Sequence, residues 1–206
     1  MFKASALLGA LLAPSFVFAA TLTTTTANNG SGGVFMNFTA GAAAIAVTGF
    51  DAYFGSEGSP VSVAVYTRPG SYVGFDNNAA GWTLHETMNT TSAGNNTLAP
   101  LGLTTSISIG AGQTVAIYLH STSPVGMRYN GTGTAPPQTT WSDANLSVFS
   151  DRARTGSTPF GGSLFTPRTF AGNIHYNVDG EVPEPGTVSF LALGLVGLTI
   201  LRRRSN

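Results

Sequence analysis

The sequence contains no cysteine, and this absence excludes several kinds of chemistry at once. Without a thiol the protein has no disulfide framework, no thiolate nucleophile and no thiolate metal site. The fold must therefore be stabilised by burial of apolar side chains and by hydrogen bonds.

Charged residues are also scarce, at 9% of the 206 residues, and the formal net charge is zero. That balance hides an uneven distribution, because four of the nine basic residues lie near the two ends of the chain. Residues 20–182 contain five arginines against eight Asp or Glu, a net charge of −3. This composition argues against a nucleic-acid partner, since binding to phosphates requires a basic surface.

The N-terminal residues have the composition of a secretory signal peptide. Lys3 supplies a positive charge, residues 4–13 are apolar, and small residues surround the bond between Ala19 and Ala20. We predict a signal peptide over residues 1–19 that is removed by cleavage of this bond. A permanent N-terminal anchor is the alternative, but the apolar run falls short of the ~20 residues that a spanning helix needs.

A second apolar segment, residues 187–201, runs directly into Arg202, Arg203 and Arg204 in the basic end 202–206. The uncharged apolar run predicts a transmembrane helix. This helix would be short, because it would span about 22 Å, less than the ~30 Å hydrocarbon core of a bilayer. The arginines predict that the C-terminus stays in the cytoplasm and that the preceding domain faces outward.

Pro183, Glu184 and Pro185 stand just before this apolar segment. Two prolines favour an extended polyproline II backbone and remove N–H donors, so the triplet is expected to stay out of helix and sheet. A protease can bind such an extended segment. The order of triplet, apolar segment and basic end over residues 181–206 resembles the PEP-CTERM sorting signal.

This resemblance implies that a membrane-embedded exosortase recognises the triplet, cleaves near it and releases or transfers the ectodomain. It also implies a Gram-negative bacterial protein that is anchored transiently in the inner membrane before it reaches the cell surface or the extracellular matrix. The secretion machinery and an exosortase-type enzyme are therefore the expected partners.

Residues 20–180 form the predicted ectodomain, which is rich in Gly, Thr, Ser and Asn and carries no long helical apolar stripe. Short β-branched or aromatic runs alternate with Gly, Pro and Asn, and Val61, Val63 and Val65 fall on one face of such a run. Two antiparallel sheets packed face to face bury strands of this kind, so we predict an all-β antiparallel β-sandwich of the jelly-roll type. The expected strands are 44–54, 61–68, 104–109, 113–120, 125–130, 145–150 and 168–178.

Two connecting segments carry specific expectations. Residues 109–112, Ile-Gly-Ala-Gly, form a compact hairpin candidate. The polar tract 21–33 is either a flexible lead-in or an edge strand of threonines.

No catalytic residue is predicted. The three histidines, His85, His120 and His175, show neither HExxH nor another local metal-binding spacing. Because neighbouring residues in a strand point to opposite faces, His85 and Glu86 are not expected to share a site.

No cofactor is expected, and calcium is the alternative because it prefers hard oxygen ligands. Asp51 and Asp179 are the candidate calcium ligands, and none of the available carboxylates lies in a DxDxDG loop. Capping of turns is the competing interpretation of these side chains. The full set of oxygen donors is Asp51, Asp76, Asn77, Asp143 and Asp179.

Large aromatic side chains allow two interpretations, a sugar-stacking platform or part of the core. The residues in question are Tyr53, Tyr72, Trp82, Tyr129 and Trp141, of which Trp82 is expected in the core.

The leading hypothesis is a non-enzymatic surface or biofilm-matrix protein that contacts extracellular polysaccharide or other surface proteins. Two alternatives stay open: a permanently membrane-anchored binding module, and a secreted hydrolase acting on polysaccharide. The hydrolase would need two carboxylates about 5 to 9.5 Å apart. Its candidate acids are Asp51, Glu57, Asp76, Glu86, Asp143 and Asp151.

Overall fold

The computed structural model describes residues 17–131 and 137–179. These residues form antiparallel β-strands and no helix, which confirms the all-β prediction. Within the same residues no helix is long and apolar enough to cross a membrane. The triplet 183–185, the apolar segment 187–201 and the arginines 202–204 lie outside the described residues, as do residues 1–16 of the predicted signal peptide.

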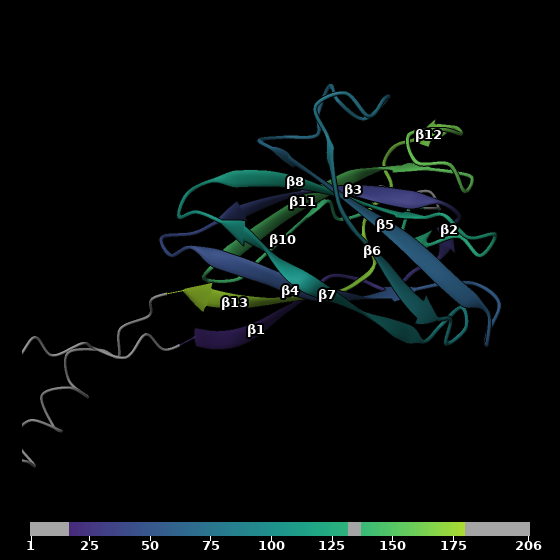
Figure 1. Cartoon of the computed structure of the whole chain (residues 1–206), viewed down its shortest axis with the longest axis horizontal. Coiled ribbons are helices and arrows are strands. Elements are labelled where there is room, and N and C mark those ends of the chain that lie inside the picture. The colour runs from purple at the N-terminus through teal and green to yellow at the C-terminus, as the bar shows by residue number, and fades with distance from the viewer. Residues whose placement is uncertain (1–16, 132–136, 180–206) are drawn as a thin grey trace, which may run out of the picture.

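Most of the described chain forms two sheets that lie as layers one over the other (Figure 1). The four-stranded sheet has the order β1 (Val17–Thr23), β13 (Gly172–Asp179), β4 (Ile45–Tyr53) and β7 (Leu98–Ile109). The seven-stranded sheet has the order β10 (Thr140–Ser142), β11 (Leu146–Arg154), β3 (Gly33–Ala40), β8 (Thr114–Ser121), β5 (Pro60–Pro69) and β6 (Thr83–Thr91), and β12 (Leu164–Phe165) pairs with β11. A separate pair joins β2 (Asn29–Gly30) to β9 (Arg128–Tyr129).

The main hydrophobic core lies between the two sheets. Val61, Val63 and Val65 of β5 belong to it, as their alternation predicts, and Ile45 and Val47 of β4 contribute to it from the other layer. Side chains from facing strands fill the space between the layers, which makes the domain a β-sandwich. The jelly-roll subtype stays a prediction.

A second apolar cluster covers the outer face of the seven-stranded sheet. Phe35 of β3 and Tyr118 of β8 stack with their ring centroids 3.8 Å apart. Tyr72, from the loop between β5 and β6, is fully buried beside them. The strands beneath this cluster are therefore buried on both faces.

The hairpin expected at residues 109–112 is wrong. The turn is tight, because the Gln113 N–H donates to the Gly110 carbonyl at 2.9 Å. However, β7 pairs with β4, whereas β8 pairs with β3 and β5. The chain thus crosses from one sheet to the other at this turn, since both strands bury an apolar face in the same core from opposite sides.

The polar tract that begins near Thr21 contains an edge strand, as one of the two interpretations proposed. Among the described residues β1 pairs only with β13, from Val17 opposite Asp179 to Thr23 opposite Asn173. The first and last strands therefore lie side by side (Figure 1).

Candidate functional site

The loop of residues 70–82, which joins β5 to β6, is fixed to the outer face of the seven-stranded sheet. Asn37 of β3 holds its first part: the Asn37 amide donates to the Ser71 hydroxyl at 2.8 Å, and the Tyr72 N–H donates to the Asn37 side-chain oxygen at 2.9 Å. The Tyr72 ring belongs to the second apolar cluster, on the outer face of the seven-stranded sheet, and stacks on Phe149 with centroids 5.9 Å apart. The loop therefore begins on a rigid support.

The Tyr72 hydroxyl is bonded to β11 through Asp151. It donates to the Asp151 carboxylate at 2.6 Å and accepts the Asp151 N–H at 3.0 Å. The ladder between β11 and β3 shifts register between Phe149 and Arg152, and this bulge brings Asp151 to the hydroxyl. Burial, together with the bond to Asp151, raises the pKa of Tyr72 above its ordinary value of 10, so the hydroxyl stays a donor.

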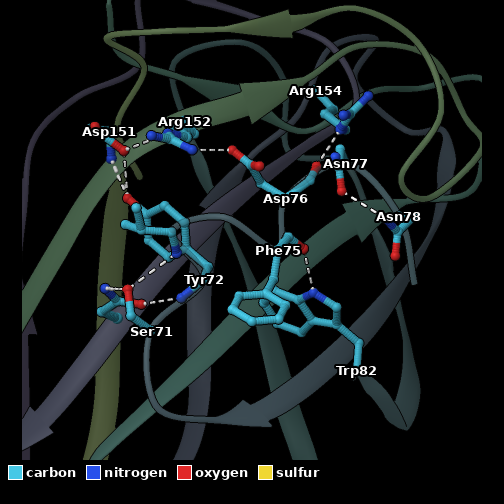
Figure 2. Close-up of polar contacts among 12 residues, drawn as sticks. Ser71, Tyr72, Phe75, Asp76, Asn77, Asn78, Trp82, Asp151, Arg152 and Arg154 are labelled. Carbon is cyan, nitrogen blue, oxygen red and sulfur yellow. Dashed lines mark hydrogen bonds and ion pairs between the residues drawn. The ribbon is translucent and has the colours of Figure 1, made fainter. Parts of the chain in front are cut away.

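Asp76 fixes the middle of the loop (Figure 2). Its side chain is buried and forms an ion pair with Arg152, while its backbone carbonyl accepts a hydrogen bond from Arg154 Nε at 2.7 Å. The bond to Asp76 raises the pKa of the Arg152 guanidinium. Arg152 Nε also lies 3.5 Å from the Asp151 carboxylate, so one guanidinium contacts both acids.

The same loop leaves apolar side chains in solvent. Phe75 is 44% exposed and Val73 is 48% exposed, although the loop around them is tightly bonded. The Arg68 guanidinium lies 3.6 Å from the centroid of the Phe75 ring, and Trp82 Nε1 donates to the Phe75 carbonyl at 2.7 Å (Figure 2). We call Arg68, Val73, Phe75 and Trp82 the Phe75 patch.

Of the two interpretations of the large aromatic side chains, burial holds for four of the five residues and the sugar-stacking platform does not. Tyr53, Tyr72, Tyr129 and Trp141 are all at most 8% exposed. Tyr72 belongs to the outer apolar cluster, and Tyr129 and Trp141 belong to the main core. Trp82 is partly buried against the outer cluster, as a core residue would be. Phe75 is an exposed aromatic residue that sequence reasoning missed.

The two calcium candidates are not brought together. The Asp51 carboxylate accepts hydrogen bonds from His175 Nε2 and the Asn173 amide, both at 2.9 Å. Asn173 lies opposite Asp51, and Asp179 lies six residues further along β13, about 20 Å away at the rise of a strand. In residues 17–131 and 137–179, no group of three or more His, Cys, Asp or Glu could hold a metal ion. Calcium binding stays a prediction without a formed site.

Asp143 caps a turn, in agreement with the competing interpretation. One carboxylate oxygen accepts the N–H groups of Asn145 and Leu146, each at 2.9 Å. The other accepts the Tyr176 hydroxyl at 2.7 Å, which ties the turn between β10 and β11 to β13 in the opposite sheet.

Three strands contribute a polar row on the four-stranded sheet. Thr21 Oγ1 lies 3.0 Å from His175 Nδ1, and His175 Nε2 lies 2.9 Å from the Asp51 carboxylate. A hydroxyl, an imidazole and a carboxylate in this order are also the parts of a nucleophilic triad. The neighbouring pair forms the same kind of contact without an imidazole: the Thr23 hydroxyl donates to the Asn173 side-chain oxygen at 2.9 Å. The polar row therefore joins β1 to β13 with or without a histidine.

His85 and Glu86 contact the same segment of β7, so the expectation that they point to opposite faces is wrong. The ladder between β5 and β6 shifts register at His85, and such a bulge turns consecutive side chains the same way. The Glu86 carboxylate accepts the Thr104 hydroxyl at 2.7 Å, and His85 Nε2 lies 2.7 Å from the Thr105 carbonyl. These bonds join the edges of the two sheets.

His120 is fully buried, with its Nδ1 2.6 Å from the Tyr118 hydroxyl. Burial lowers its pKa to about 4, so the imidazole is neutral at physiological pH. The three histidines therefore lie in three separate structural environments.

Comparison with known proteins identifies the tail. A family model described as the PEP-CTERM protein-sorting motif matches residues 181–204. The chain carries a PEP-CTERM sorting motif. The match includes Pro183, Glu184 and Pro185, the triplet singled out in the sequence. No curated protein matches the chain.

The PEP-CTERM motif indicates an exported protein that an exosortase, a membrane enzyme, processes on its way to the cell surface. The motif starts two residues after Asp179, the last residue of β13. The sorting motif thus follows closely after the four-stranded sheet in the sequence, whereas the Phe75 patch lies on the outer face of the other sheet.

Proposed function

We propose that the protein is a non-enzymatic surface or matrix component whose β-sandwich binds extracellular polysaccharide through the Phe75 patch. The proposal is supported mainly by the exposed ring of Phe75. Aromatic side chains bury large areas when they pack, and an aromatic ring held in solvent on a well-bonded loop offers that area to a ligand.

The chemistry of the patch suits a sugar. The apolar C–H face of a pyranose ring stacks on an aromatic face, and hydroxyl groups around the ring accept hydrogen bonds from nearby donors. Arg68 supplies a guanidinium next to Phe75, and the exposed amides of Asn77 and Asn78 follow in the same loop. Stacking and hydrogen bonding can therefore act on one sugar residue.

Preorganisation favours binding at this loop. Binding normally costs about 0.5–1.5 kcal/mol for each flexible side chain that becomes ordered. The bonds of Tyr72 and Asp76 already fix the loop on both sides of Val73 and Phe75. Ligand binding therefore requires little further ordering of the loop.

The processing steps belong to the same proposal. Cleavage between Ala19 and Ala20 releases the N-terminus, and the segment 187–201 holds the chain in the inner membrane with Arg202 to Arg204 in the cytoplasm. An exosortase then cuts near Pro183, Glu184 and Pro185 and delivers the β-sandwich to the surface or matrix.

We assign a structural role to the acids that a hydrolase would use. Asp76 and Asp151 contact the same Arg152 guanidinium and hold the loop, which is a function that both carboxylates serve without a substrate. The hydrolase alternative predicts that Asp151→Asn abolishes release of reducing sugar ends from the polysaccharide, whereas our proposal predicts that the wild-type protein releases none.

Affinity electrophoresis tests the binding proposal. Extracellular polysaccharide purified from the producing cells is cast into a native gel, with dextran as a neutral reference. Polysaccharide in the gel should retard Phe75→Ala less than the wild type. Its apparent affinity for the polysaccharide should be at least tenfold lower. Phe165→Ala is the matched control, because Phe165 is 41% exposed and also lies near an arginine, with Arg168 at 5.6 Å. Equal retardation of Phe75→Ala and wild type would overturn the proposal, as would equal loss in both variants.

A further inference from the structure

The bond between Ala19 and Ala20, the predicted site of signal cleavage, lies inside a paired strand. β1 starts at Val17, and Ala19 and Ala20 stand opposite Asn177 and Tyr176 of β13. The completed fold therefore contains the bond that the signal peptidase has to cut.

Backbone hydrogen bonds flank this bond on both sides. The Thr24 N–H donates to the Gly172 carbonyl at 2.9 Å, and hydrogen-bonded pairs recur at every second residue of an antiparallel ladder. In the register of β1 with β13, the pairs Phe18 with Val178 and Ala20 with Tyr176 are then hydrogen-bonded. A protease that binds its substrate as an extended strand needs these same backbone groups and room around them.

Side chains reinforce the pairing close to the bond. Thr21 contacts His175, Thr23 donates to Asn173, and the Thr24 hydroxyl lies 3.0 Å from the Gly172 carbonyl. Every partner belongs to the last strand of the described chain, and Asp51 of β4 holds His175 from the far side. Side-chain bonds thus join the segment from Thr21 to Thr24 to β13, directly after the predicted cleavage site.

The order of the strands decides when this closure happens. Within residues 17–131 and 137–179, β13 is the strand partner of β1, and it is also the last strand to emerge during synthesis and export. Until Gly172–Asp179 arrives, nothing in the described fold pairs with Ala19 and Ala20. We propose that docking of β13 closes the signal-cleavage site, so that removal of residues 1–19 must precede completion of the β-sandwich.

This inference rests on the proposed export signal, and an order-of-addition experiment separates the two. Full-length precursor is synthesised in vitro with detergent micelles, and purified signal peptidase is added either during synthesis or after folding is complete. Loss of residues 1–19 is followed by intact mass. We expect cleavage in the first reaction and at least tenfold slower cleavage in the second.

A variant tests whether β13 is responsible for the protection. His175→Pro removes a backbone donor from the middle of β13 and should block its docking. Its precursor should be cut at similar rates in both reactions, whether or not the rest of the domain folds, because the bond stays unpaired in either case.

The outcomes are distinguishable. Equal cleavage of the wild-type precursor before and after folding would overturn the inference. The prediction of a cleavable signal peptide would still hold. No cleavage in either reaction would overturn the predicted signal itself, and the inference with it. Continued protection of His175→Pro would show that another element shields the bond and would also contradict the inference.

Discussion

Val17 lies opposite Asp179 in the ladder between β1 and β13, so the first and last described residues lie on neighbouring strands. The sorting motif begins two residues beyond Asp179, and the predicted signal peptide, residues 1–19, ends inside β1. The predicted signal peptide and the sorting motif therefore adjoin neighbouring strands of the same sheet. The Phe75 patch lies on the outer face of the other sheet.

Tyr72→Phe should destabilise the protein by about 1–2 kcal/mol. The substitution removes the hydroxyl that bonds both the carboxylate and the N–H of Asp151, and it leaves those groups without their partner. Urea unfolding measures the difference. Tyr66→Phe is the control from the same aromatic cluster, and an effect as large as that of Tyr72→Phe would contradict the assignment.

Arg152→Ala should cost roughly 3 kcal/mol of stability, because it leaves the buried Asp76 carboxylate without its counter-charge. Adding Asp76→Ala should recover part of that loss, since the uncompensated charge is then gone. Thermal unfolding of the two single variants and the double variant measures the coupling. Strictly additive losses would mean that the ion pair does not hold the loop.

Acid should weaken the fold through His120. Its pKa falls from 6.5 when unfolded to about 4 when folded, so the unfolded chain binds more protons between these values. The stability contributed by neutral His120 is complete above pH 6.5 and is lost as the pH falls towards 4, by up to about 3 kcal/mol. Besides burial, the positive charge of Arg154 opposes protonation.

The measurement compares the pH dependence of unfolding for the wild type with that of His120→Phe. The wild type should lose more stability than the variant between pH 6.5 and 4. Parallel curves would show that His120 is not the group responsible.

Glu86→Gln should loosen the contact between β6 and β7. Partial burial acts to raise the pKa of Glu86, but hydrogen bonds from Thr104 and Thr105 outweigh it and lower the pKa below 4.5. The contribution of the carboxylate is thus present at neutral pH and lost as the pH falls below 4.5 through the folded value. Wild type and variant should differ by about 1 kcal/mol at pH 7 and converge at pH 3. A constant difference over this range would contradict the role of the charge.

The sequence predicted strands well where one face of a strand is buried. Val61, Val63 and Val65 alternate with less buried neighbours, and β5 follows their pattern closely. β3 was missed because Phe35 packs outward under the loop 70–82 while Val34, Met36 and Phe38 pack inward, so no alternation remains. β6 was missed for the opposite reason, since Met88 is its only buried residue.

The candidate site was harder to predict, because its parts come from distant strands. Asn37, Asp151 and Arg152 hold the loop from β3 and β11, and no local spacing connects them to Tyr72 or Asp76. One local signal was available: Phe75 is an aromatic residue within the turn-forming run Gly74 to Asn78. The bulge that brings His85 and Glu86 to one segment depends on pairing with β5, which their own sequence does not reveal.

The intact mass of the protein recovered from culture medium and from membranes tests export and sorting most directly, because it locates both termini at once. Our account predicts that the secreted form lacks residues 1–19 and everything beyond the region of Pro183, Glu184 and Pro185, and that Pro183→Ala with Glu184→Ala blocks this processing. Secreted protein that still carries Arg202, Arg203 and Arg204 would contradict it.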